Sequence, residues 1–353
     1  MSAKDSFVHL HVHSEYSMLD GAAKVGPLVK EAARLGMPAI AITDHGNNFG
    51  SYDFYEECQD AGIKPIIGIE AYLTPGTTHR SSRTRERWGG GGEDDVSAGG
   101  AYTHMTMLAY SNEGMHNLFR LSSLASMEGQ YLKPRMDREL LQMYGKGIVA
   151  TTGCASGEVQ TRLRLGQYEE ALKAASDYRD IFGAENFYCE IMDHGIDIER
   201  RVMSDLLRLA KDLNLPLVAT NDLHYTHAHD AEAHDALLCV QSGSTLQTPD
   251  RFKFSGSEYY LKTAEEMREL FRDYPEACDN TLLIAERVDL KFEKRDLLPR
   301  FPVPEGHDEA SWFEAEVGVG LKRRFPGGVS EEHRMQADYE VEVIKKMGFP
   351  GYF

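Results

Sequence analysis

The stretch FVHLHVH, residues 7–13, decides the fold and also carries the first signal of a site. Histidines alternate in it with apolar residues, and a period of two is typical of a β-strand with one buried face. On such a strand His9, His11 and His13 share a face. Several ionisable rings on a buried face are costly unless a metal ion or a charged partner holds them. The stretch therefore predicts a strand that contributes to a metal site.

Beyond this stretch, short apolar runs alternate with amphipathic helical segments through the first two-thirds of the chain. This rhythm is typical of a parallel α/β sheet or barrel. The predicted strands are Phe7–His13, Pro38–Thr43, Lys64–Leu73, Tyr102–Ala109, Gly147–Thr151, Phe187–Met192 and Pro216–Thr220. After about Thr245 the pattern predicts helices only, with a linker over 297–306. We expect a barrel over 1–245, containing a flexible loop over 77–100, and a helical extension over 246–353.

Composition excludes several classes of protein. With 42% hydrophobic residues the chain is predicted to fold rather than to be disordered. Its net charge of -18 excludes a broad electropositive surface for nucleic acid. No long apolar run predicts a secretory signal or a membrane span. The five cysteines form no CxxC pair and are odd in number, which argues against a disulfide framework and favours the cytoplasm.

Further metal-ligating residue types recur in or just after the predicted strands. They are Asp20, Asp44, His45, Glu70, His104, Cys154, Asp222 and His224. In a parallel barrel the C-terminal ends of the strands line one mouth, so residues distant in sequence converge there. The mixture of imidazole, carboxylate and one thiolate suits zinc, with manganese or iron as alternatives. The set exceeds what one zinc ion needs, which implies more than one ion.

Some of these residues have simpler interpretations. Asp20 precedes a glycine and also fits a turn, and Cys154 also fits a small buried apolar residue. Asp44 fits a group that orients the imidazole of His45, or a helix cap, and His9 also fits a group that supports a ligand. Clustered divalent ions lower the pKa of a bridging water and stabilise in-line displacement at phosphorus. Hydrolysis of a phosphoester is therefore the predicted reaction class.

Basic side chains near the predicted mouth are candidates for contacts with phosphate. They are Arg80, Arg83, Arg85, Arg162 and Arg164. A solvated charged loop is the simpler interpretation of those within 77–100.

Four motifs give the sequence a close resemblance to the polymerase and histidinol phosphatase (PHP) family. They are HVHSEYSMLDG from His11, TDHG from Thr43, GIEAY from Gly68 and ATNDLHY from Ala219. The flanking segments GIKPIIGIEAYL, TTGCASGEVQ and MGFPGYF are similar to one branch of that family, the N-terminal part of bacterial, and in particular actinobacterial, polymerase III alpha subunits.

The resemblance implies a distorted (βα)7 barrel with three divalent ions at its mouth. The first ion would be held by His11, His13, Glu70 and Asp222 and would carry the attacking hydroxide, which makes these four the expected catalytic residues. The second would be held by Glu70, His104 and Cys154, and the third by Asp20, His45 and His224.

By the same resemblance, the expected activity is proofreading 3′ to 5′ exonuclease hydrolysis, with the primer 3′ end of DNA as the substrate. The rest of the alpha subunit and the replisome would be partners, no membrane contact is expected, and the polymerase palm would follow Phe353. A small-molecule phosphatase of the PHP type and a catalytically silent structural module are the two alternatives.

Overall fold

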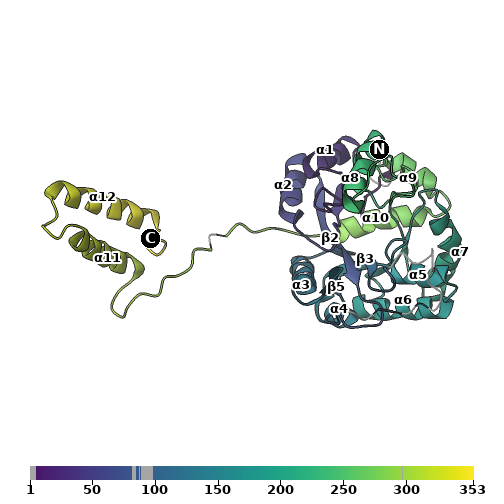
Figure 1. Ribbon diagram of the computed structural model, residues 1–353, viewed down its shortest axis with the longest axis horizontal. Helices are drawn as coiled ribbons and strands as arrows, with labels where there is room; N and C mark the ends of the chain where they lie inside the picture. The colour runs from purple at the N-terminus through teal and green to yellow at the C-terminus, as the bar shows by residue number, and fades with distance from the viewer. Residues whose placement is uncertain (1–4, 82–84, 87, 89–97, 296) are drawn as a thin grey trace. The chain divides into compact units, whose positions relative to one another are not determined.

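The computed structural model describes residues 5–81, 85, 86, 88, 98–295 and 297–353 (Figure 1). The chain divides into two compact units, Met1–Lys291 and Phe292–Phe353. Most of the loop predicted over 77–100 lies outside the described residues. Among the described residues, no helix combines the length and the apolar character that crossing a membrane requires.

One mixed sheet of eight strands forms the centre of the first unit. The strands are β1 (Ala39–Ile42), β2 (Lys64–Leu73), β3 (Thr103–Ala109), β4 (Gln130–Tyr131), β5 (Lys133–Met136), β6 (Ile148–Thr151), β7 (Phe187–Ile191) and β8 (Leu217–Ala219). They are ordered β4-β5-β2-β3-β6-β7-β8, and β1 pairs with β2. The pairs β1–β2, β6–β7 and β7–β8 are parallel, as predicted. The short β4–β5 hairpin was not predicted from the sequence.

The segment 7–13 closes this curled sheet between β1 and the end of β8. On one side the amide of Ala41 donates to the carbonyl of His9 at 2.9 Å. On the other side the amide of His13 donates to the carbonyl of Leu223 at 2.7 Å. The sequence predicted seven strand positions, and these are filled by this segment together with β1, β2, β3, β6, β7 and β8. The β4–β5 hairpin is additional. The segment itself is extended backbone with isolated bridges at Val12 and Ser14, rather than a continuous strand.

One strand runs against the predicted parallel order. β3 is antiparallel to both β2 and β6, with Glu70 opposite Thr106 and Leu108 opposite Val149. The N-terminal end of β3 therefore lies at the edge where β2 and β6 have their C-terminal ends. The prediction of an all-parallel sheet is wrong at this strand, while the closed α/β architecture is as predicted.

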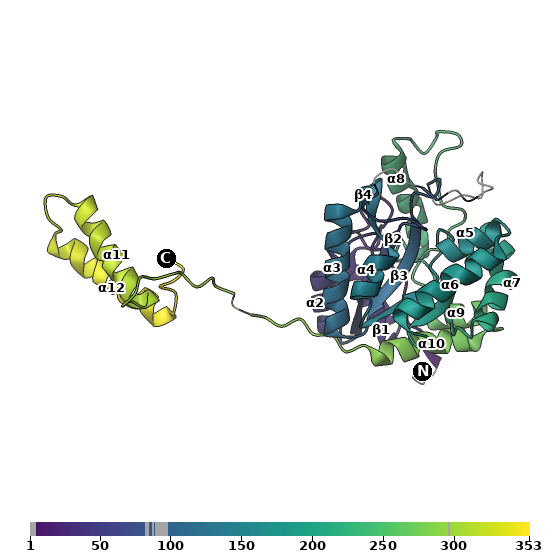
Figure 2. The same ribbon diagram turned by 90° about the horizontal axis from the view of Figure 1, so that it is seen from below.

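Ten helices of the described residues surround or cap this sheet. They are α1 (Val25–Arg34), α2 (Ser51–Ala61), α3 (Asn112–Glu128), α4 (Arg138–Tyr144), α5 (Glu158–Arg164), α6 (Tyr168–Phe182), α7 (Asp197–Asp212), α8 (Ala231–Ser242), α9 (Ala264–Leu270) and α10 (Pro275–Arg287). Figures 1 and 2 show them around the strands.

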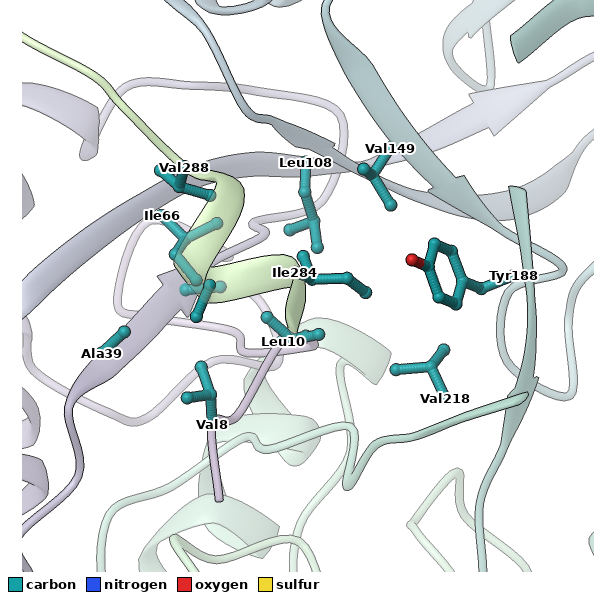
Figure 3. Close-up of a cluster of buried hydrophobic side chains, with 12 residues drawn as sticks. Val8, Leu10, Ala39, Ile66, Leu108, Val149, Tyr188, Val218, Ile284 and Val288 are labelled. Carbon is teal, nitrogen blue, oxygen red and sulfur yellow. The ribbon is translucent and has the colours of Figure 1, made fainter. Parts of the chain in front are cut away.

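Helix α10 seals one end of the sheet. Its Ile284 packs with Leu10, Ile66, Leu108 and Val218 in an apolar cluster drawn in Figure 3. The first compact unit therefore extends to Lys291. The sequence placed the division at residue 245, where helices replace strands, because an amphipathic pattern does not show which surface a helix covers.

The second unit is a helical hairpin of α11 (Glu309–Arg324) and α12 (Glu331–Met347). Both helices begin at polar caps, where Asp308 accepts from the amide of Ser311 and Ser330 accepts from the amide of His333. Val341 is the one buried residue among those described in this unit. The residues between Lys291 and α11, which include the range 297–306 predicted as a linker, form no helix or strand where they are described.

Candidate metal centre

The N-terminal segment contributes two histidines to the centre, not three. The backbone bends at His11, so the regular alternation ends there. Leu10 packs in the apolar cluster at the base, whereas His11 and His13 face the carboxylates above it. The prediction that His9 shares their face is wrong for this reason. His9 instead donates from Nε2 to the carbonyl of Lys262 at 2.8 Å.

Glu70 of β2 lies at the middle of the centre and is 1% exposed. Its Oε2 is 2.6 Å from Nδ1 of His45. Its Oε1 is 3.0 Å from Nδ1 of His104, 3.2 Å from Sγ of Cys154 and 3.3 Å from Nε2 of His11. His104 reaches this carboxylate because β3 is antiparallel and begins at the same edge of the sheet. Oε2 also lies 3.4 Å from Nε2 of His13, so one carboxylate contacts five potential ligands from four different segments.

Asp222 approaches the same histidines from the segment after β8. Its Oδ1 is 3.2 Å from Nε2 of His13 and 3.4 Å from Nε2 of His11. The backbone at Asp222 has φ +41°, a left-handed conformation that aspartate tolerates better than most side chains. The preceding residue fixes the backbone here, because the side-chain amide of Asn221 donates to the carbonyl of Tyr260 at 2.7 Å.

Asp20, His45 and His224 form the third side of the centre. Nε2 of His45 is 3.2 Å from Oδ2 of Asp20. The ring of His13 stacks between the rings of His45 and His224, with centroids at 4.1 and 4.4 Å. Nδ1 of His224 donates to the carbonyl of Asp222 at 2.8 Å, which leaves Nε2 as its lone-pair nitrogen.

The buried ligand atoms of the centre that lack a satisfactory hydrogen bond fit the binding of metal ions. Six buried polar atoms of the centre make no hydrogen bond of favourable geometry with any described residue, although some of them lie close to one another. They are Nε2 of His11, His13 and His224, Nδ1 of His45, Oε2 of Glu70 and Oδ1 of Asp222. Buried polar groups are seldom left unpaired, and a cation supplies what these atoms lack. Three overlapping trios place their ligand atoms within 4.8 Å of one another: His11, His13 and Glu70; His13, His45 and His224; His45, Glu70 and His104.

Electrostatic coupling between these groups shifts the pKa values of His11 and His13 in opposite directions. Burial lowers the pKa of His11, but the carboxylates of Asp222 and Glu190 outweigh burial and raise that pKa well above its ordinary value. For His13, burial and the neighbouring imidazole of His45 lower the pKa to about 3. A cation bound between them would take the place of the proton on His11.

The acidic groups of the centre behave in opposite ways. Burial raises the pKa of Glu70, but the imidazoles of His104 and His45 outweigh burial and hold that pKa well below its ordinary value. Burial and the charge of Glu70 raise the pKa of the Cys154 thiol well above its ordinary value. Cys154 would therefore become a thiolate only with a cation beside it.

Two groups that orient the histidines complete the centre. Nδ1 of His11 donates to Glu190 at 2.8 Å, and Nδ1 of His13 donates to Ser17 at 3.0 Å. The hydroxyl of Ser17 in turn donates to Asp44 at 2.8 Å. Each contact fixes a ring so that Nε2 faces the centre, which is the usual support of a metal-binding histidine.

Asp44 was predicted in this supporting role, whereas Glu190 and Ser17 were not predicted. A charged residue inside the apolar run FYCEI of β7 was the available signal for Glu190. His194, which lies outside the sequence motifs, is buried beside the centre. It donates to Glu199 at 2.7 Å and to the carbonyl of Asn221 at 2.8 Å, directly before Asp222.

The arginines proposed for DNA contacts are engaged within the protein where they are described. Arg80 pairs with Glu128 at 2.7 Å and Arg162 with Glu158 at 3.1 Å. Arg85 donates to the hydroxyl of Tyr131 at 3.1 Å, and Arg164 donates to Thr161 at 3.1 Å. Arg83 lies outside the described residues. Their role in binding DNA stays a prediction.

The structure brings all nine predicted ligand residues together at one end of a closed α/β barrel. Fold and site together define an α/β-barrel protein with a candidate metal centre. The sequence model of the PHP domain matches residues 9–194, and the chain belongs to the PHP domain family.

Curated relatives extend the similarity beyond that domain. The chain is 56% identical to the DNA polymerase III subunit alpha of Mycobacterium tuberculosis (strain H37Rv) over 359 residues, covering 100% of this chain and 30% of the relative. It is 57% identical to the same subunit of Saccharopolyspora erythraea over 363 residues, covering 99% and 30%. The chain thus spans about 30% of the length of the curated relatives it matches.

Among solved structures, a two-domain protein from Bacteroides vulgatus contains a predicted PHP-like metal-dependent phosphoesterase. It is 17% identical to this chain with a TM-score of 0.34, and the match covers 78% of this chain and 63% of that one.

Proposed function

We propose that the first unit hydrolyses the terminal phosphodiester of DNA from the 3′ end, as a metal-dependent proofreading exonuclease. The observation that carries this proposal is the gathering of six buried ligand atoms without a satisfactory hydrogen bond, one of which is Oε2 of Glu70. Such a set of imidazoles, carboxylates and one thiol suits divalent ions, with zinc favoured and manganese or iron as alternatives.

The nine residues divide into three proposed ligand groups. His11, His13, Glu70 and Asp222 would hold one ion, and Glu70 with His104 and Cys154 a second. The third would be held by Asp20, His45 and His224. Bound divalent ions of this kind lower the pKa of a water molecule toward neutrality and neutralise charge that develops at phosphorus.

The chain's own residues supply orientation and exclusion of water. Glu190 and Ser17 hold the rings of His11 and His13, so that their lone pairs face the centre before any substrate arrives. The apolar cluster around Ile284 closes the end of the barrel opposite the metal centre, so that substrate approaches only from the end that carries the centre. Preorganised groups of this kind need no rearrangement during reaction, which is how they accelerate it.

The relatives supply the setting for this activity. Because they are DNA polymerase III alpha subunits, we propose the primer 3′ end as the substrate and the remainder of such a subunit, with the replisome, as partners. DNA synthesis would then belong to parts of the parent protein outside these residues. All five cysteines are free, which agrees with the reducing cytoplasm as the proposed location.

A mismatched primer tests this proposal. The full chain, loaded with zinc or manganese, is incubated with a 5′-labelled primer that ends in a 3′ mismatch, and shortening is followed on gels. Glu70→Gln is expected to reduce the rate roughly a hundredfold or more, because it removes the shared carboxylate. Glu113→Gln, an exposed glutamate of α3, is the matched control and is expected to retain the wild-type rate.

Two results would contradict the proposal. Faster hydrolysis of a phosphomonoester such as p-nitrophenyl phosphate than of the primer would assign the centre to a small-molecule phosphatase. Metal-dependent stabilisation of the wild-type chain, without hydrolysis of either compound under any of these metals, would assign it to a structural role.

A further inference from the structure

A segment of alternating basic and aromatic residues lies beside the metal centre, in the loop that follows α8. It reads Arg251-Phe252-Lys253-Phe254. The ring of Phe254 meets the ring of His224 edge to face at 4.8 Å. The ring of Phe252 lies 6.1 Å from that of Phe254 and is 53% exposed. Successive ring contacts therefore lead from a predicted metal ligand to the protein surface. Figure 2 shows the loop projecting beyond α8.

Contacts on both sides hold this segment in place. Arg251 forms a bidentate ion pair with Asp235 of α8, in which Nη1 of Arg251 lies 2.7 Å from Oδ1 of Asp235. Phe254 packs edge to face on Tyr259, with centroids 4.9 Å apart. Between these two anchors, Phe252 and Lys253 are both exposed. The anchors thus present an aromatic ring and an ammonium group to solvent, next to the phenylalanine that contacts His224.

The chemistry of the two exposed side chains fits one class of ligand. Unpaired nucleobases stack on aromatic rings, and ammonium groups attract the phosphates between them. A positive charge at this position is notable on a chain with a net charge of -18. The described arginines that the sequence offered for phosphate contacts, such as Arg80 and Arg162, already pair with glutamates. Phe252 and Lys253 therefore offer the phosphodiester strand a contact that those arginines do not.

We propose that Phe252 and Lys253 bind single-stranded DNA whose 3′ end reaches the metal centre. Phe252 stacks on a base of the terminal nucleotides, and Lys253 faces an adjacent phosphate. Unpaired strands are selected because a base within a duplex does not offer its face to Phe252. The path of the strand toward the centre rests on the proposed exonuclease function, whereas binding to the segment itself is measured independently of turnover.

Fluorescence anisotropy measures this binding directly. The probe is a 5′-fluorescein thymidine oligonucleotide whose 3′-terminal linkages are phosphorothioates, so that it resists hydrolysis during titration of the full chain. Phe252→Ala is expected to raise Kd about five- to tenfold, since stacking contributes about 1–3 kcal/mol per base and this ring is partly exposed. Phe252→Trp is expected to restore wild-type affinity. Lys253→Gln is expected to reduce the slope of log K against log salt by roughly 0.7.

Phe301→Ala is the matched control, because Phe301 is also 53% exposed but belongs to the second unit. It is expected to leave Kd unchanged. With a hydrolysable strand, Phe252→Ala is expected to raise KM while kcat stays constant, as loss of uniform binding does. Melting temperatures of all variants should match the wild type, since each altered side chain is exposed.

The outcomes separate this inference from the proposed function. If the wild type shortens primers but Phe252→Ala binds the probe as tightly as the wild type, the inference is overturned and the exonuclease stands. If binding depends on Phe252 but no metal supports hydrolysis, the exonuclease is overturned and the binding segment stands. Equal affinity for a blunt duplex of the same sequence would also overturn the inference.

Discussion

We predict that Glu190 strengthens metal binding by orienting the ring of His11. It is fully buried on β7 and accepts hydrogen bonds from Nδ1 of His11 at 2.8 Å and from the hydroxyl of Thr220 at 2.6 Å. Its second oxygen accepts from the hydroxyl of Thr151. All three neighbours act as donors, so an acceptor-only carboxylate suits the position. The contact fixes His11 with Nε2 free for a cation.

Glu190→Gln changes charge and hydrogen bonding but little volume. A glutamine side chain has one oxygen that accepts hydrogen bonds and one nitrogen that does not. In either orientation of the amide, the nitrogen therefore faces a donor, which is Thr151 in one case and the pair of His11 and Thr220 in the other. The negative charge that makes the imidazole of His11 a stronger ligand also disappears. Loss of such an orienting partner typically costs ten- to a hundredfold in metal affinity. We therefore expect zinc affinity to fall by about 1.4–2.7 kcal/mol.

Competition with a chromogenic chelator measures this change in zinc affinity. The matched control is Glu158→Gln, because Glu158 is equally a buried glutamate but pairs with Arg138 at 2.9 Å and Arg162 at 3.1 Å. That variant should melt at a lower temperature, since it weakens the pairing of two arginines, and should bind zinc as the wild type does. If Glu190→Gln binds zinc within twofold of the wild type, orientation of His11 by Glu190 contributes nothing and the reasoning is refuted.

Three further predictions address other parts of the molecule. Cys154→Ser should lower the amount of zinc retained after dialysis, measured by elemental analysis, whereas Cys189→Ser, at a buried cysteine of β7, should not. Ile284→Ala should lower the free energy of unfolding by about 2–5 kcal/mol in urea titrations and Leu283→Ala, 52% exposed on the same helix, by less than about 0.5 kcal/mol; equal effects would contradict the sealing role of α10. Burial raises the pKa of Asp137, but hydrogen bonds from the amides it caps outweigh burial and lower that pKa below 3.8, so its stabilisation is present above about pH 4 and is lost as the pH falls through the lowered value. The free energy of unfolding of Asp137→Ala should be about 1 kcal/mol lower than that of the wild type at neutral pH, and this difference should shrink toward zero in acid. A difference that stays constant with pH would contradict the stabilising role of the Asp137 carboxylate.

The sequence predicts the ring of seven positions because each strand is a short apolar run bounded by turn residues. It fails where the backbone departs from a regular period. The bend at His11 separates His9 from the two histidines that join the centre, and no residue in the alternating stretch marks that bend. Period-two reasoning therefore predicts three imidazoles on one face where the structure has two.

Supporting residues are harder to predict than ligands for a physical reason. A ligand can be inferred from its residue type and its position near a strand end. Glu190 and Ser17 support the centre only through a hydrogen bond to one particular ring, and the choice of ring depends on side-chain geometry that a sequence does not contain. In the same way, the pattern of α10 predicts an apolar face but not the barrel base that the face covers.

His104 shows that a correct site can follow from an incorrect strand direction. In an all-parallel barrel only C-terminal strand ends meet at the mouth, and His104, the second residue of β3, would then lie at the opposite end from Glu70. It lies 3.0 Å from Glu70 because β3 runs antiparallel. The reversal also places Thr106 of β3 opposite Glu70 and within 3.1 Å of His11, so the same strand contributes a ligand and a supporting hydroxyl. His104 therefore joins the other eight residues because of the one strand whose direction the sequence pattern does not reveal.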